Sequence, residues 1–431
     1  MPRAATYRVG AMALLLGLLI GGNNLLKILR DSVFLGHHSV SELPYLYILV
    51  AFIAGLVIAT YTRYTARVSI MRLILASNAT ILSATVFFWI VLTYFDPGWS
   101  HYAFYIWSAM ASVIAVAQAW TLTNQLFTQE EGKRFFGVIA AGGTVGGIFA
   151  SFGSRWSIHL SVESNHLLWG VAAIYVAAFV LVIAVQAWLT DGTFRGDVRS
   201  MEDRHADYKV SIRELLVGSP YLKSIASVIL VSVVVSTLID FHFKTGAKQA
   251  YSSKQELAAF FSLYYGWLNV ATLIVQVLFT GRVLSKLGLG TALYITPGVL
   301  LTGLLALMGW PGLLSATFTR MADAVLRNSV HRTAMEVVYM NLPGPIVKAV
   351  KTFLDVVVER LGDGTAGFLI LFFSLLPVEN YLNYIHLVCI GMIFIWLFLN
   401  RVLRAGADQI AVTGAADARA QRIWLERGTG E

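Results

Sequence analysis

The chain has 431 residues, of which 57% are hydrophobic and only 13% charged, and its formal net charge is +8. Soluble domains carry roughly 25% charged residues, so this composition excludes a water-soluble globule and predicts lipid as the main solvent. The basic residues are dispersed between apolar runs, which argues against nucleic-acid binding. The single cysteine, Cys389, excludes an internal disulfide and any CxxC metal or redox motif.

Apolar stretches of about 20 residues, the length that crosses a hydrocarbon layer of roughly 30 Å, recur along the chain. They predict an all-α membrane protein with about twelve transmembrane helices. The first stretch runs into Lys27, Arg30 and Asp31 without a small-residue cleavage site, so we expect a retained helix and not a signal peptide. The predicted spans are 8–30, 44–62, 69–94, 101–126, 136–157, 166–189, 221–243, 257–280, 289–309, 311–338, 349–376 and 382–403.

Basic residues follow the even-numbered spans, as at Arg63, Lys133, Arg282 and Arg401, whereas the alternate loops carry almost none. The positive-inside rule therefore places both termini in the cytoplasm, and we expect the chain to lie in an inner (cytoplasmic) membrane.

A polar segment, residues 191–220, separates six predicted spans from six. The pair Arg30–Asp31 at the end of the first span has a counterpart in Asp240–Lys244, about 210 residues later. Two six-helix halves with a substrate cavity between them form the major-facilitator arrangement. The predicted parts are residues 1–190, the connector 191–220, residues 221–404 and a cytoplasmic tail, 405–431.

Charged residues inside apolar spans are the candidate functional groups, because each costs roughly 2.5–3.5 kcal/mol at the centre of an inserted helix. Three- and four-residue spacing puts those of the tenth and eleventh spans on helical stripes. Two such stripes can bind a polyanion, or can pair with each other to hold a gate shut, and the pattern leaves both open. The candidate substrate-binding or coupling residues are Lys27, Arg30, Asp31, Asp240, Lys244, Arg320, Asp323, Arg327, Lys348, Lys351 and Asp355.

The sequence predicts no cofactor, no metal site and no catalytic constellation, so we expect no enzyme. The glycine-rich segment 141–147 lacks the lysine of a phosphate-binding loop, and close helix packing explains it better. His37 and His38 in an outer loop are expected to be solvated.

Ordered motifs in both predicted halves carry a resemblance over nearly the whole chain. They are ILRD at 28–31, WTLTNQ at 120–125, EGKRFF at 131–136, DFHFK at 240–244, RNS at 327–329, EVVY at 336–339, KTFLD at 351–355 and RLGD at 360–363. With these motifs the chain resembles the ATP/ADP translocase family of bacterial and plastid nucleotide exchangers.

Of four charged positions that are linked to substrate in that family, two are retained in this chain and two are replaced. Asp240 and Lys351 match, whereas a family lysine falls on Val33 and a family glutamate on Ser108. The resemblance implies a monomeric carrier that moves a phosphorylated or carboxylated metabolite by alternating access, with nucleotide exchange as one form of it. Export of an amphipathic compound or lipid, and a non-transporting scaffold or sensor, are the alternatives.

Overall fold

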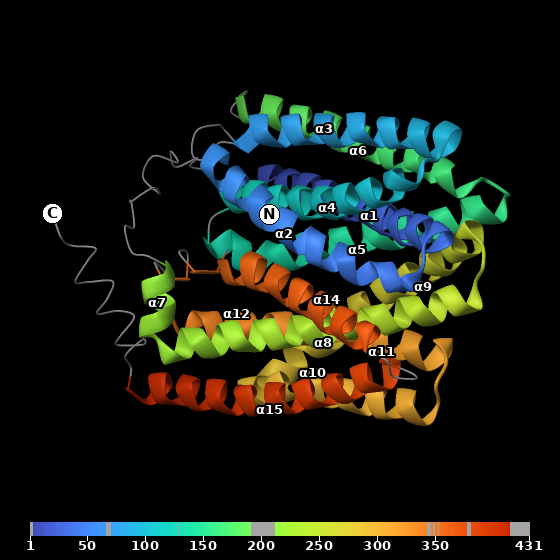
Figure 1. Ribbon diagram of the computed structural model, residues 1–431. Helices are drawn as coiled ribbons and strands as arrows, with labels where there is room; N and C mark the ends of the chain where they lie inside the picture. The colour runs from blue at the N-terminus through green and yellow to red at the C-terminus, as the bar shows by residue number, and fades with distance from the viewer. Residues whose placement is uncertain are drawn as a thin grey trace. The chain divides into compact units, whose positions relative to one another are not determined.

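The computed structural model describes residues 3–65, 70–127, 129–190, 212–342, 346–347, 350–351, 353–376 and 381–413. Within these residues every regular element is a helix (Figure 1). A bilayer offers no hydrogen-bond partner to a free backbone group, and a helix satisfies its own. The predicted all-α class is confirmed.

Nine helical stretches among the described residues are long and apolar enough to cross a membrane. One of them, Lys254–Gly309, is 56 residues long and contains two predicted spans, and its backbone leaves helical geometry at Gly288, where φ is 75°. The charged segments 313–340 and 353–375 are helical but are not among the nine. The count of about twelve spans therefore stays a prediction.

The helices form two compact units. Unit 1 comprises Met1–Val40, Leu56–Arg199 and Ala247–Leu273, and unit 2 comprises Ser41–Gly55, Ser200–Gly246 and Ile274–Glu431. Each unit thus includes a segment that the sequence assigned to the other half. The predicted part boundaries stay a prediction, and residues 191–211 and 414–431 lie outside the described ones.

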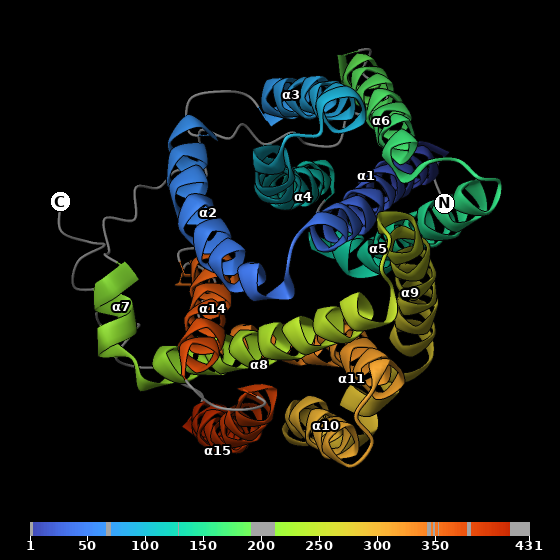
Figure 2. The same ribbon diagram turned by 45° about the vertical axis from the view of Figure 1, so that its right-hand side comes forward.

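Unit 1 is built around α1, which packs against α4, α5 and α6, while α3 lies beside α6 (Figure 2). Its fully buried aromatic side chains include Phe34, Phe104 and Tyr175. The helices are α1 Arg3–His37, α3 Ile70–Ile90 with the π-helical η2 Val91–Phe95, α4 Gly98–Leu126, α5 Gln129–His159, α6 Leu167–Thr190 and most of α9 Lys254–Val275, with a short turn η3 Ser164–His166.

In unit 2, α10 packs against α11, α12 and α15, and α14 packs against α15. Phe241 and Trp396 are fully buried there. Its elements are most of η1 Val40–Glu42, the first part of α2 Leu43–Thr65, α7 Ile212–Gly218, most of α8 Pro220–Ala250, η5 Gln276–Thr280, α10 Gly281–Gly309, α11 Leu313–Leu326, η6 Arg327–His331, α12 Arg332–Met340, η7 Phe353–Val358, α14 Glu359–Leu375 and α15 Tyr381–Thr413.

The glycine-rich segment of α5 lies directly against α1. A Cβ added at Gly142 would lie 2.7 Å from the carbonyl oxygen of Ala13, and one at Gly146 would overlap that of Gly17. Glycine lets the two backbones approach where any side chain would clash. The prediction that this segment serves helix packing is confirmed.

Large apolar side chains stand exposed on the outer faces of these helices, among them Phe52, Phe149 and Phe318. Soluble proteins rarely expose contiguous apolar surface, whereas a helix in lipid does so by default. These faces fit a protein embedded in a bilayer.

Candidate functional site

The carboxylate of Asp240, on α8, accepts hydrogen bonds from two elements of unit 2 besides its own helix. Nζ of Lys244 lies 2.9 Å from Oδ2, one turn along α8. Nε of Arg320, on α11, donates to Oδ1 at 3.0 Å, and the hydroxyl of Tyr47, on α2, donates to Oδ2 at 3.1 Å. The local pair of Asp240 and Lys244 that the sequence allowed is present, and Arg320 joins it from 80 residues away.

Asp323 continues this arrangement one turn along α11. Its Oδ2 lies 2.5 Å from Nη1 of Arg320 and accepts a hydrogen bond of 2.5 Å from Oγ of Ser236 on α8. Its Oδ1 lies 3.3 Å from Nη2 of Arg327, which also donates to the carbonyl oxygen of Ser232 at 2.7 Å. Three cations and two carboxylates therefore alternate, and we call them the α8–α11 ion-pair chain: Lys244, Asp240, Arg320, Asp323 and Arg327.

Two members of the α8–α11 ion-pair chain are buried, and the other three are partly exposed. The side chain of Asp323 is 0% exposed and that of Lys244 2%, whereas those of Arg320 and Arg327 are 21% and 24% exposed. Burying a charge costs several kcal/mol unless partners with good geometry repay it. Each charge in this group is paired with at least one opposite charge, which offsets the cost of burial, and these pairs join α8 to α11.

A second charged group in unit 2 connects α12 to the segment that follows it. Nζ of Lys351 lies 2.6 Å from Oε2 of Glu336 and 5.3 Å from the ring centre of Tyr339. The hydroxyl of Tyr339 donates to Asp355 at 2.8 Å. The spacing put Lys351 on one stripe with Asp355, whereas its salt bridge is made to Glu336 on α12. Lys348 lies outside the described residues.

In unit 1, Arg30 and Asp31 pair with each other at the end of α1. Nε and Nη2 of Arg30 donate to the two carboxylate oxygens at 2.9 and 3.2 Å, and the guanidinium lies 4.7 Å from the ring centre of Tyr105. The hydroxyl of Tyr265, on α9, donates to Oδ2 of Asp31 at 3.2 Å. Lys27 is half-buried one turn earlier on the same helix.

The stripe predicted for the tenth span is only partly realised. Arg320, Asp323 and Arg327 share a face, but the π-helical η6 widens the turn from Arg327 onward. His331 is buried with its ring 5.5 Å from that of Trp396 on α15. A π-helical segment places one more residue in a turn, so an α-helical period cannot locate the residues beyond it.

Sequence reasoning missed the hydroxyl donors of these groups. Tyr47, Tyr265 and Ser236 each donate to a carboxylate of these charged groups, yet nothing in their local sequence distinguishes them from packing residues. From sequence alone, a tyrosine inside a span is interpreted as an aromatic packing residue, because the hydrogen-bond partner of its hydroxyl lies on another helix.

Comparison with known proteins decides the family. A model of the family described as TLC ATP/ADP transporter matches residues 32–309, well over half of the chain. The chain belongs to this family. The TLC ATP/ADP transporters are membrane carriers and not enzymes, so the expected absence of catalytic chemistry agrees with family membership. Asp240 and Lys244 lie within the matched residues, whereas Arg320, Asp323 and Arg327 lie beyond them.

The chain is also similar, at low sequence identity, to proteins named ADP,ATP carrier proteins. ADP,ATP carrier protein 1 of Chlamydia muridarum is 24% identical over 300 residues, covering 61% of this chain and 56% of the relative. The chloroplastic ADP,ATP carrier protein 2 of Arabidopsis thaliana is 24% identical over 331 residues, covering 69% of this chain and 53% of the relative. The matches thus span little more than half the length of these relatives.

Solved structures show the fold. A D-xylose–proton symporter aligns with a TM-score of 0.64 at 12% identity, covering 91% of this chain and 97% of the symporter. A bacterial homologue of the iron transporter ferroportin, in an inward-facing state, aligns with a TM-score of 0.59 at 13% identity, covering 92% and 98%. At these identities the likeness concerns the fold alone, which is that of major-facilitator-like transporters.

Proposed function

We propose that this chain moves a phosphorylated anion across the bacterial inner membrane by alternating access, and that the α8–α11 ion-pair chain supplies the cations that bind it. The observation that carries the proposal is the alternation of three cations and two carboxylates in unit 2, in which Lys244 and Asp323 are buried and the other three are partly exposed. A static helix contact in lipid needs no such set, because apolar packing costs less than buried charge.

Arg320 is the centre of the proposed binding group. Its guanidinium divides its donors between Asp240 and Asp323, at 3.0 and 2.5 Å. Guanidinium donors form a planar fork that suits carboxylate and phosphate oxygens equally. A phosphate can therefore take the place of one carboxylate at Arg320 without leaving the cation unpaired.

This competition explains why binding and movement would be linked. Without substrate, the carboxylates neutralise the buried cations. When a phosphate binds Arg320, the displaced carboxylate must find another cation or accept a proton, because a lone buried charge is costly. Binding of the anion thus changes the contacts that join α8 to α11.

A nucleotide is the first candidate substrate, since the curated relatives are named ADP,ATP carrier proteins. Two family positions differ here, and both are buried: Val33 replaces a lysine and Ser108 a glutamate. The loss of one phosphate-facing cation widens the candidates to smaller phosphorylated or carboxylated metabolites.

The test is transport by the purified full chain in proteoliposomes, with a panel of labelled nucleotides, sugar phosphates, carboxylates and lipophilic compounds. We expect saturable uptake of at least one phosphorylated anion, faster when the same anion is present inside. Arg320→Gln should abolish that uptake. Arg404→Gln is the matched control, because it removes an exposed i,i+4 pair with Asp408 elsewhere in unit 2.

Transport of lipophilic compounds alone would contradict the proposal. So would uptake by Arg320→Gln at the rate of the unaltered chain. Insertion and folding of each variant are checked by gel filtration in detergent, so that loss of protein is not mistaken for loss of transport.

A further inference from the structure

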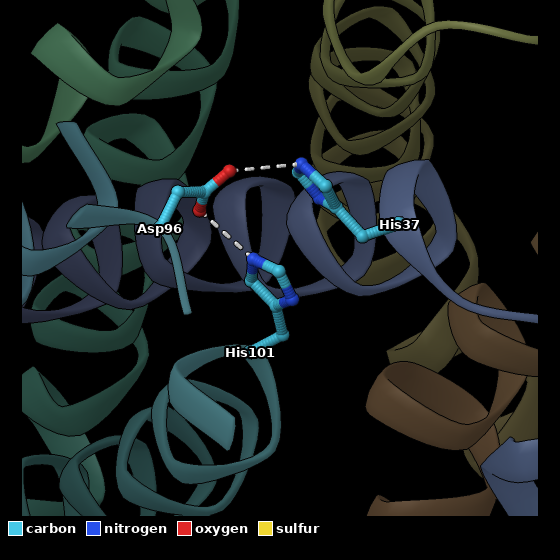
Figure 3. Close-up of side chains that lie close together, drawn as sticks. All are labelled: His37, Asp96 and His101. Carbon is cyan, nitrogen blue, oxygen red and sulfur yellow. Dashed lines mark hydrogen bonds and ion pairs between the residues drawn. The ribbon is translucent and has the colours of Figure 1, made fainter. Parts of the chain in front are cut away.

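Three metal-ligating side chains meet in unit 1, away from the charged groups described above. Figure 3 shows His37 from the end of α1, Asp96 from the connection between η2 and α4, and His101 from the first turn of α4. Their ligand atoms all lie within 4.8 Å of one another. We propose that these residues bind a divalent transition-metal cation, with Zn²⁺ as the representative ion.

The separations of the ligand atoms suit a metal of this class. Nε2 of His101 lies 2.9 Å from Oδ1 of Asp96, and Nε2 of His37 lies 3.3 Å from Oδ2. Ligands at about 2.0–2.1 Å from a tetrahedral Zn²⁺ are about 3.3 Å apart. Two imidazoles and one carboxylate form a donor set that Zn²⁺, Fe²⁺ and Co²⁺ accept, with at least one position left for water.

The ring of His37 is stacked on that of His101, with ring centres 4.2 Å apart and planes at 16°, so one ring must turn for both Nε2 atoms to reach the same ion. Nδ1 of His37 lies 2.8 Å from the carbonyl oxygen of Val33. A carbonyl oxygen can only accept, so in the neutral ring Nδ1 carries the hydrogen and Nε2 has the lone pair. In that form the lone pairs of Nε2 and of the Asp96 carboxylate face each other at 3.3 Å, and either a proton or a metal cation between them removes the repulsion.

His101 has the outer contact that a ligating histidine needs. Its Nδ1 lies 3.0 Å from Nε2 of His38, whose Nδ1 lies 3.2 Å from the hydroxyl of Tyr102. Coordination at Nε2 of His101 fixes the hydrogen on Nδ1, where it is donated to His38. Such contacts set the tautomer and hold the ring toward the metal. The expectation that His38 is merely solvated is therefore wrong.

The backbone at Asp96 supports the geometry. Asp96 has φ 42° and ψ 43°, in the left-handed region, and it precedes Pro97, a position that favours extended backbone. Its N–H donates to the carbonyl oxygen of Val91 at 2.7 Å. The carboxylate is held at this place by a conformation that a free loop would avoid.

Two of the three proposed ligands are partly exposed, so a cation can reach them from solvent. The side chains of His37 and Asp96 are 30% and 39% exposed, whereas that of His101 is 4% exposed, so the position has an open side and an anchored side. Lys254 is the nearby competing cation, and its Nζ donates to Oδ1 of Asn165 at 3.1 Å. A bound ion would tie the end of α1 to the start of α4.

The test is Zn²⁺ binding to the purified full chain in detergent, after removal of any affinity tag and treatment with a chelator. Isothermal titration should give one equivalent of Zn²⁺ per chain, and Co²⁺ should give visible d–d absorption typical of low coordination number. Asp96→Asn and His101→Ala should each weaken binding at least tenfold. His166→Ala is the matched control, because His166 faces a single carboxylate, Glu163, at 4.0 Å in the same unit.

Thermal unfolding provides a second measurement that does not depend on transport. Zn²⁺ should raise the unfolding midpoint of the unaltered chain and of His166→Ala, but not that of Asp96→Asn. If His101→Ala fails to fold, His37→Asn replaces it, since that ring is partly exposed. The proposal would be overturned if Zn²⁺ showed no saturable binding to the unaltered chain. It would also be overturned if the Asp96 and His37 variants bound Zn²⁺ as tightly as the unaltered chain.

Discussion

Two carboxylates, Asp31 on α1 and Asp240 on α8, stand about 210 residues apart in the sequence and have both similar and different surroundings. Each accepts a tyrosine hydroxyl from a helix far away in the sequence: Tyr265 of α9 at 3.2 Å for Asp31, and Tyr47 of α2 at 3.1 Å for Asp240. This correspondence is what an internal repeat of about 210 residues would produce.

The described salt bridges of the two carboxylates differ in the helices that supply the cation. Asp31 pairs with its own neighbour, Arg30, so that contact moves with α1 as one piece. Asp240 pairs with Lys244 of α8 and with Arg320 of α11. A salt bridge between two helices must break or change partner if those helices separate. The group in unit 2 is therefore the better candidate for coupling an anion to movement.

The largest expected effect is on stability, at Asp323. Asp323→Asn removes the carboxylate that two arginines share, and breaking a buried pair by deleting one partner costs about 3–5 kcal/mol. Thermal unfolding in detergent measures it. Asp363→Asn removes a carboxylate that is 23% exposed and pairs with Arg360, whereas Asp323 is 0% exposed, so this control should cost less. Equal losses would show that the burial of Asp323 has no special weight.

Asp240→Asn tests function at the same ion-pair chain. The amide keeps the volume of the side chain and removes its charge, so we expect normal insertion but transport slowed roughly 10- to 100-fold, following the loss of about 1.5–3 kcal/mol from charge-assisted bonds. Uptake in proteoliposomes and gel filtration measure the two quantities. Full transport by this variant would leave Asp240 with the role of a helix pair only.

A matched pair of tyrosine variants sharpens the comparison between the units. Tyr47→Phe and Tyr265→Phe each remove one hydrogen bond to a carboxylate, and each should cost about 1.5 kcal/mol of unfolding free energy. Only Tyr47→Phe should also change the affinity for the transported anion. If Tyr265→Phe changes that affinity as much, the two carboxylates share the function.

The smallest stability effect is expected at Lys351. Its salt bridge to Glu336 is 32% and 49% exposed, so Lys351→Gln should change stability by no more than about 1 kcal/mol. If Lys351 binds the anion, affinity should nevertheless fall by about 1.5–3 kcal/mol. A collapse of stability with unchanged affinity for the identified substrate would assign Lys351 a structural role instead.

Hydropathy located the helices well, because an apolar run of spanning length has few other solutions in a bilayer. It underestimated their ends. The first predicted span ended at residue 30 and the seventh at residue 243, whereas α1 continues to His37 and α8 to Ala250. Charged and polar side chains close an apolar window, but a helix continues as long as its backbone hydrogen bonds do.

The contacts between charged residues were harder to predict from the sequence than the locations of the helices. Charge spacing along one helix indicated Asp323 with Arg327, but the contact of Arg320 with Asp240 joins residues 80 positions apart. The cluster of His37, Asp96 and His101 has the same character, because its members come from three segments with no shared motif. Periodicity describes one helix at a time, and these groups form only when several helices are assembled.

The contact of α1 with α5 sets a limit on how unit 1 can move. Where Gly17 meets Gly146, a single methyl group on Gly146 would overlap the backbone of α1, so the two helices are packed backbone against backbone. We therefore expect α1 and α5 to stay in contact here, because the close approach of their backbones depends on these glycines facing each other. The Arg30–Asp31 pair rides on α1, and it must therefore travel together with α5 in any rearrangement of this unit.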